Sequence, residues 1–324
     1  MYRLGAKTVA RPHSTKQERM TTSPQRETSI SQREIVSWLQ SGQLQPVHHS
    51  SRTQEDEQLR EKINRYAASR VQKGDGWWIT PPNPATRVVQ EHNIRRGRVK
   101  VVEQLCLELP KGAWVLDWAG GTGWAASMLL KRRSDLVVVC IDISDVLQEW
   151  GRSNYPERIL YVSGDATSRH IFEPVLFEAI VGAECVEHFP NLKSAISTAH
   201  YWLKQGGKLV VTTPNAGYWS PVPPESIRRL LGRPPSRAHE EQSGIYDQSI
   251  PSNILAETMR GAGFQDVSVE YTQYGGEWPL AGICNHIGEG TAQLAARTAE
   301  FFERIAPRSF GRKLGFTQIF SGRK

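Results

Sequence analysis

A short apolar run closed by a glycine-rich turn constrains this 324-residue chain more than any other feature. The run covers residues 114–117, and the turn covers residues 119–123 with the sequence Ala-Gly-Gly-Thr-Gly. Glycines let the backbone approach a ligand closely, and the first turn of a following helix offers free N–H groups. The segment therefore predicts a strand, a ligand-binding turn and a helix in immediate succession.

Similar apolar runs recur along the chain and set the fold class. They are separated mostly by stretches of helical character. Continuous β-branched runs suit strands that are buried on both faces of a parallel sheet, and their alternation with helices indicates a layered domain. We predict an α/β fold, a Rossmann-like three-layer sandwich, with strands at residues 114–117, 136–142, 159–162, 177–182, 208–215, 267–271 and 316–320.

Composition divides the chain into three parts. Residues 1–58 are polar with little periodicity, and we expect most of this segment to be mobile. Residues 59–110 are expected to form a helical N-terminal segment that acts as a lid. The remainder, residues 111–324, is the expected main domain, with insertions at 216–250 and 275–315.

Helical periodicity and breaker residues place the longer helices. We expect them at residues 55–69, 85–109, 251–262 and 292–305, with a short one around 35–39. The helix at 292–305 carries Leu294, Phe301, Phe302 and Ile305 on one face. Our interpretation is that this face packs on the core. A membrane-surface or lid role is the alternative.

The hydropathy and the cysteine content of the chain favour a protein of the cytoplasm. No run of about 18 apolar residues is present, so we expect no transmembrane segment. The four cysteines lack CxxC spacing, which is typical of reduced thiols. The net charge is +7, and residues 297–324 hold seven Arg or Lys against two Glu. We interpret this excess as a solvated basic tail, not as a surface for nucleic acid.

The turn does not match the two best-known phosphate-binding patterns. The dinucleotide fingerprint G-x-G-x-x-G has glycine at its first, third and sixth positions, which here are Ala119, Gly121 and Trp124. The sixth position should be small, whereas tryptophan is the largest side chain. A P-loop is excluded because no Gly-Lys-Ser/Thr follows. The ligand must therefore be decided by other residues.

Carboxylates follow three successive predicted strands. Asp117 precedes the turn, where it would repel a pyrophosphate but suits an ammonium group. Asp142 ends the second strand, where a carboxylate can accept hydrogen bonds from ribose hydroxyls. Asp165 follows the third strand, within expected reach of an adenine amino group. Acids at three strand ends, taken together, indicate a site for a cationic nucleoside.

On these residues the chain resembles class I S-adenosylmethionine-dependent methyltransferases of the small-molecule type. The likeness covers residues 111–215 and is weaker to 324. The family motif D-x-G-x-G-x-G stands here as residues 117–123, with Ala119 in place of the first glycine, as in quinone-biosynthesis methyltransferases. The resemblance implies a seven-stranded, mostly parallel sheet with an antiparallel last strand. It implies S-adenosylmethionine as cofactor, S-adenosylhomocysteine as product, and contacts from Asp117, Ala119, Gly120, Gly121, Gly123, Asp142, Ile143, Asp165, Ala166, Ala183 and Glu184.

A Glu-x-x-Glu-His segment after the fourth strand leaves three interpretations open. The first is that Glu187 and His188 steady the turn into the next helix. The second is that His188 is a general base for an acceptor hydroxyl, since imidazole exchanges protons near neutral pH. The third is a divalent metal site of Glu184, Glu187 and His188, similar to sets in ubiquinone O-methyltransferases and small-RNA 2′-O-methyltransferases. Mg²⁺ or Mn²⁺ would suit those ligands, with His239 as a fourth.

The acceptor is expected to be a small molecule. The Asn-Pro-Pro-Tyr or Asp-Pro-Pro-Tyr motif of enzymes that methylate base or glutamine amines is absent after the fourth strand. Three segments can cover the acceptor: the Trp77-Trp78 loop, residues 218–246 and residues 275–310. An RNA 2′-O-methyltransferase and a non-catalytic binder with this fold are the alternatives.

Overall fold

The structure of the chain is a computed structural model. It describes residues 29–41, 47–48, 54–73, 83–217, 247–274, 288–305, 310, 312–313 and 315–324. The expectations for the Trp77-Trp78 loop, for His239 and for the segment 218–246 concern residues outside these ranges.

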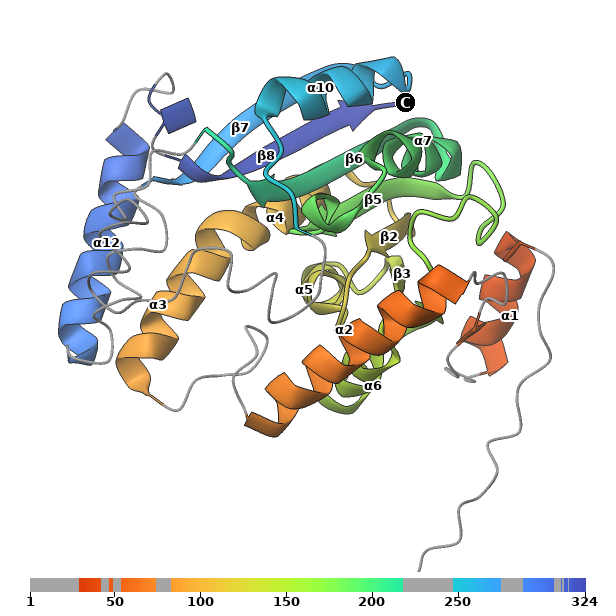
Figure 1. The fold of residues 1–324 in the computed structure, drawn as a ribbon, viewed down its shortest axis with the longest axis horizontal. Helices are drawn as coiled ribbons and strands as arrows, with labels where there is room; N and C mark the ends of the chain where they lie inside the picture. Colours follow the sequence, from red (N-terminus) through yellow and green to blue (C-terminus); the bar gives the residue numbers. More distant parts are fainter. Residues whose placement is uncertain are drawn as a thin grey trace, which may run out of the picture.

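One twisted sheet forms the centre of the molecule (Figure 1), and its strand order is β1-β4-β3-β2-β5-β6-β8-β7. Neighbouring strands are parallel except β8, which runs antiparallel to both β6 and β7. The predicted α/β sandwich with an antiparallel last strand is confirmed. Its seven main strands are β2 (Trp114–Trp118), β3 (Val137–Asp142), β4 (Ile159–Ser163), β5 (Phe177–Ala183), β6 (Leu203–Pro214), β7 (Gln265–Tyr274) and β8 (Gly315–Arg323).

The eighth strand, β1 (Val47–His48), pairs with β4 at the sheet edge. This strand could not be predicted from the sequence, because two residues are too short a run to give a periodic signal.

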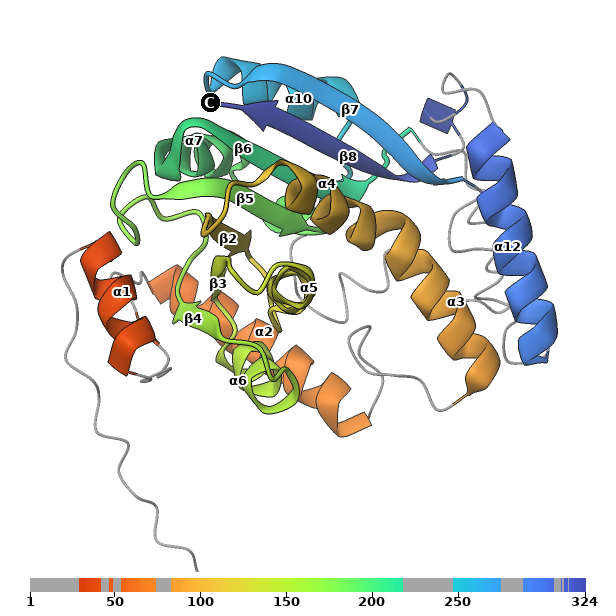
Figure 2. The same ribbon diagram turned by 180° about the vertical axis from the view of Figure 1, so that it is seen from behind.

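Helices cover both faces of the sheet, as a parallel sheet requires. On one face, α4 (Lys100–Glu108) and α5 (Trp124–Arg132) bury Leu105 and Leu129 against the strands. On the other face, α7 (Leu192–Trp202) and α10 (Ser252–Gly261) bury Trp202 and Met259. Figure 2 shows α4 and α5 on the near side. Helix α6 (Asp145–Asn154) follows β3.

The short helix expected around residues 35–39 is present and extends over residues 32–41. Helix α1 (Gln32–Ser41) begins with a capping box in which the Ser31 N–H donates to Glu34 Oε2 at 2.8 Å. Ile30 and Ile35 are fully buried and belong to the core. Two buried apolar side chains thus anchor residues 29–41, whereas the expectation that most of residues 1–58 are mobile stays a prediction.

The helix expected at residues 85–109 is present but interrupted. It consists of α3 (Pro84–Ile94), a π-helical turn (Arg95–Val99) and α4. The π-helical turn contains Gly97, and a side chain there would approach Gln273 Nε2 at 3.1 Å.

In the described ranges, no helix combines the length and apolarity that crossing a membrane requires.

Candidate functional site

The glycine turn lies at the carboxyl end of β2, and three of its residues have left-handed backbone. The φ angles are 48° at Ala119, 57° at Gly121 and 77° at Gly123, which is the N-cap of α5. The Gly120 N–H donates to the Ile141 carbonyl at 3.0 Å and ties the turn to β3. Ala119 is the strained position, because a Cβ disfavours positive φ. Such strain persists where the surroundings impose it, which is typical of functional sites.

The side chain of Tyr161, in β4, contacts the glycine turn. Its hydroxyl donates to the Thr122 carbonyl at 3.0 Å. A Cβ at Gly123 would lie 2.8 Å from that hydroxyl, and a Cβ at Gly151 would lie 2.0 Å from the Thr122 carbonyl oxygen. Neither Tyr161 nor Gly151 could be identified from the sequence, because both lie in segments with the pattern of an ordinary strand and an ordinary helix.

Asp117 lies beneath the turn with only 1% of its surface exposed. Its Oδ2 accepts a hydrogen bond from the Ala126 N–H at 2.9 Å. A Cβ at Gly120 would lie 2.5–2.7 Å from the carboxyl group, so this position must be glycine for the carboxyl to sit there. Burial raises the pKa of Asp117 to about 7, the Ala126 hydrogen bond opposes the rise, and the nearby Asp142 adds to it. Within the described residues no cation pairs with this buried carboxylate, and such a group suits an incoming positive charge.

Asp142 ends β3 and is 8% exposed. Its Oδ2 accepts from the Gly121 N–H and its Oδ1 accepts from the Ser144 N–H, both at 2.8 Å. Burial raises its pKa, and these two hydrogen bonds oppose the rise. The carboxylate therefore links the glycine turn to the start of α6 in a fixed orientation.

Asp165 and Ala166 follow β4 at the same edge of the sheet. Asp165 Oδ1 accepts from the Thr167 N–H at 2.8 Å, and burial raises the pKa of Asp165. The Trp118 indole N–H donates to the Ala166 carbonyl at 2.7 Å, and its ring lies 4.8 Å from that of Phe189. Trp118 thus fixes the loop that holds Asp165. In the sequence motif this tryptophan occupies a variable position, which gave no sign of this role.

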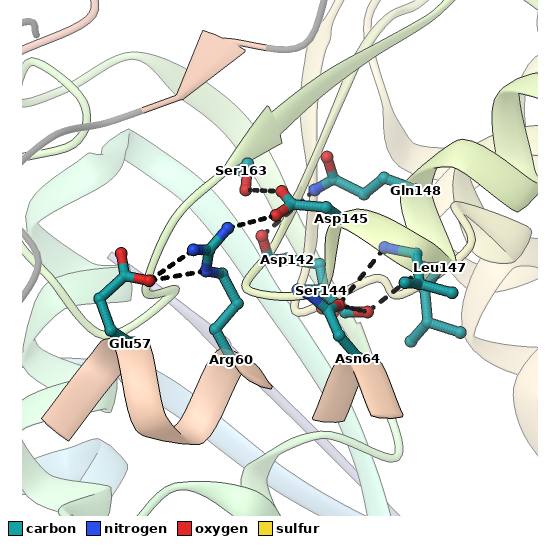
Figure 3. Close-up of polar contacts among 10 residues, drawn as sticks. Glu57, Arg60, Asn64, Asp142, Ser144, Asp145, Leu147, Gln148 and Ser163 are labelled. Carbon is teal, nitrogen blue, oxygen red and sulfur yellow. Dashed lines mark hydrogen bonds and ion pairs between the residues drawn. The ribbon is translucent and has the colours of Figure 1, made fainter. Parts of the chain in front are cut away.

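Helix α2 (Gln54–Lys73) closes the same edge from outside (Figure 3). Arg60 lies between Glu57 and Asp145, with an ion pair of 2.6 Å to Asp145 at the start of α6. Asn64 accepts a hydrogen bond from the Ser144 hydroxyl at 2.8 Å, and that hydroxyl also caps α6. Figures 1 and 2 both show α2 lying against α6. A helix that is remote in sequence therefore contacts the turn carrying Asp142.

The end of β5 supplies a second strained position. Glu184 has a φ of 58°, and its N–H donates to Thr212 Oγ1 at 2.9 Å. Because β5 lies next to β2, Ala183 and Glu184 occupy the same edge of the sheet as Ala119. Two non-glycine residues with positive φ thus mark the carboxyl ends of adjacent strands.

Glu187 and His188 lie on the single 3₁₀ turn Val186–His188 but in opposite environments. Glu187 is 3% exposed. Its pKa is raised well above the usual value, mainly by burial and secondly by repulsion from Glu184. His188 is exposed, and it lies close enough to Asp142 for a positive charge on its ring to lower the pKa of that carboxyl. The imidazole is therefore near the proposed nucleoside site and open to solvent.

The residues of the metal-site interpretation, one of three left open above, do not converge. Within the part of the chain that the structure describes, no three His, Cys, Asp or Glu side chains are grouped so that they could hold a metal ion. The reason is local, since Glu187 is turned into the protein whereas His188 is exposed. Glu184, Glu187 and His188 thus do not fit a metal centre in this structure.

Comparisons with known proteins agree with this geometry. The family model described as "Methyltransferase domain" matches residues 90–269. A ubiquinone biosynthesis O-methyltransferase of Coxiella burnetii is 26% identical over 204 residues, which cover 61% of this chain and 80% of that protein.

Solved structures show the same fold. A chain of the complex containing the Haloferax volcanii Trm112 methyltransferase activator superposes with a TM-score of 0.52 at 14% identity, covering 82% of this chain and 96% of that one. Phosphoethanolamine N-methyltransferase 2 of Haemonchus contortus, solved with phosphomonomethylethanolamine and S-adenosylhomocysteine, gives 0.50 at 15% identity, covering 82% and 60%.

The family match spans more than half of the chain and includes the glycine turn, both strained positions and the three strand-end carboxylates. The fold, with its antiparallel β8, is shared with methyltransferases of known structure. The chain therefore belongs to the methyltransferase domain family and is an S-adenosylmethionine-dependent methyltransferase.

Proposed function

We propose that this methyltransferase acts on an oxygen or carbon atom of a small-molecule acceptor. The observation that carries the proposal is the position of His188, exposed at the carboxyl end of β5 and near Asp142. A base at that place can receive the proton that a hydroxyl acceptor loses. The Coxiella burnetii relative, named as an O-methyltransferase, supports the oxygen acceptor.

The strand-end residues define how the cofactor would lie. Asp117 would hold the methionine ammonium group, directly or through water, because its carboxylate is buried and no cation of the described part of the chain pairs with it. Asp142 would accept from the ribose hydroxyls, and Asp165 with Ala166 would flank the adenine. The remaining proposed contacts are Ile143 beside the ribose, the turn residues Ala119, Gly120, Gly121 and Gly123, and Ala183 with Glu184 at the methionine end.

Methyl transfer requires the alignment of donor and acceptor more than the activation of either one. An electron pair of the acceptor atom forms a bond to the methyl carbon while the bond from that carbon to sulfur breaks, which leaves S-adenosylhomocysteine. The acceptor proton passes to His188. Holding donor and acceptor in line contributes most of the rate, because it converts an encounter between two molecules into a step within one complex. The base adds about 10²–10⁴-fold.

We expect His188→Gln to lower kcat at least 100-fold with a phenolic acceptor, because glutamine cannot take up the proton. The KM for S-adenosylmethionine should stay unchanged, since the proposed cofactor contacts are intact. The assay follows labelled methyl transfer to small phenols, to compounds with an acidic C–H bond and to RNA. His170→Gln is the matched control, because His170 is an exposed histidine outside the proposed site. Transfer to RNA alone, or full activity of His188→Gln, would refute the proposal.

The contact between α2 and the turn at Ser144 is also proposed to serve cofactor binding. Asn64→Leu removes the acceptor of the Ser144 hydroxyl. We expect the Kd for S-adenosylmethionine to rise about two- to tenfold, the equivalent of one lost hydrogen bond. Calorimetry measures it, with Asn154→Leu at the exposed end of α6 as control. Equal affinity of wild type and Asn64→Leu would show that α2 is only a structural cover.

A further inference from the structure

Helix α12 (Glu289–Ile305) presents a line of apolar side chains to solvent. Leu294, Phe301 and Ile305 are 67%, 58% and 57% exposed. They are seven and four residues apart, so they lie along one face over about 16 Å of helix. The prediction that this face packs on the core is wrong for these three residues. Other large exposed apolar residues, such as Leu107, Val175 and Ile254, are scattered over different elements.

The opposite face of α12 accounts for its attachment to the protein. Ala292 and Ala296 are buried, and the helix lies beside α3 at one end of the molecule (Figures 1 and 2). Glu300 contacts the buried His92 of α3 at 3.2 Å, and Glu303 pairs with Lys100 at 3.1 Å. The inward face of α12 thus combines small residues with both of its C-terminal carboxylates.

This arrangement leaves the outward face basic. Arg297 and Arg304 are exposed beside the apolar line, whereas Glu300 and Glu303 are engaged with α3 and α4. Beyond the helix, Phe310 is 52% exposed and Arg312 and Lys313 are exposed, which repeats the combination of apolar and basic side chains.

We propose that α12 docks the enzyme on an anionic lipid surface. A helix with apolar residues flanked by arginines lies in the plane of a bilayer interface, with its apolar side chains inserted and its cations near lipid phosphates. The exposed arginines beside the apolar line favour an anionic lipid surface as the partner of this face, because their positive charge complements it. The inference is independent of the acceptor proposed above.

Flotation of the full chain with vesicles tests the proposal. One set contains phosphatidylcholine with 30% phosphatidylglycerol and the other phosphatidylcholine alone. We expect binding to the anionic set and at least tenfold weaker binding to the neutral set or in high salt. The variant Leu294→Ser with Ile305→Ser should bind at least tenfold more weakly, since two inserted side chains are lost. Arg297→Glu with Arg304→Glu should lose the preference for anionic vesicles.

The control is Leu107→Ser, because Leu107 is 88% exposed on a different helix, α4. It should bind vesicles like the wild type. Equal binding to both vesicle sets, no binding to either set, or equal losses in the control and the α12 variants would overturn the proposal. So would a dimer in solution that the serine substitutions dissociate without changing vesicle binding, since a second copy would then cover the face.

Discussion

Replacing Asp117 by Asn is expected to weaken S-adenosylmethionine binding about 10- to 150-fold. The estimate corresponds to about 1.5–3 kcal/mol for a hydrogen bond between charged groups. Asparagine keeps the shape of the side chain and can still accept from the Ala126 N–H. It cannot supply the negative charge that the proposed ammonium contact requires. Isothermal calorimetry at pH 7.5 measures the difference.

The stability of the ligand-free variant separates this effect from misfolding. Burial penalises the ionised form of Asp117, so its raised pKa means that the wild-type fold loses stability as pH rises from about 4 to about 7. Asp117→Asn lacks this penalty, and we expect it to unfold at no lower temperature than the wild type at pH 8. Glu173→Gln, an exposed acid outside the site, is the control. Unchanged cofactor affinity in Asp117→Asn would exclude the ammonium contact.

Cofactor affinity is expected to depend strongly on pH around neutrality. With a pKa of about 7, Asp117 is largely protonated at pH 6 in the free enzyme and must lose that proton to bind a cation. Affinity should therefore fall by up to tenfold for each pH unit below 7. Above pH 8 the cofactor's own α-amino group loses its proton, since such groups titrate near 7.7–8.0. We expect the tightest binding between pH 7 and 8.

Calorimetric titrations from pH 5.5 to 9 test this profile. The acidic limb should disappear in Asp117→Asn, because the titrating group is gone. Asp142 is a second buried acid at this site, and burial raises its pKa as well. An acidic limb that persists in Asp117→Asn and is absent from Asp142→Asn would assign the titration to Asp142 instead.

Much of the fold could be predicted because its signals are local. Each main strand is an apolar run, and each strand-end acid follows its run directly in the sequence. The geometry then places Asp117, Asp142 and Asp165 at the carboxyl ends of three adjacent parallel strands, since parallel pairing brings those ends to one edge. The order of acids along the chain was therefore sufficient to anticipate that they lie at one edge of the sheet.

Features that depend on contacts between distant segments were missed. Asn64 reaches Ser144 across 80 residues of sequence, and nothing in the periodicity of α2 indicates that contact. Trp118 and Tyr161 support the site through backbone carbonyls, which any residue provides. Helix α12 was assigned the wrong inward face because its apolar line suggested a core. Its actual inward face uses Ala292, Ala296 and two paired glutamates.

Direct calorimetry of the full chain with S-adenosylmethionine tests the central claim. If the strand-end carboxylates form a site for a cationic nucleoside, wild-type protein should bind one equivalent with a micromolar Kd. Asp142→Ala should weaken that binding by about 1–3 kcal/mol, because a charged acceptor for the ribose hydroxyls is lost. Absence of heat at millimolar cofactor, or equal affinity of the Asp142→Ala variant, would contradict this assignment of the site.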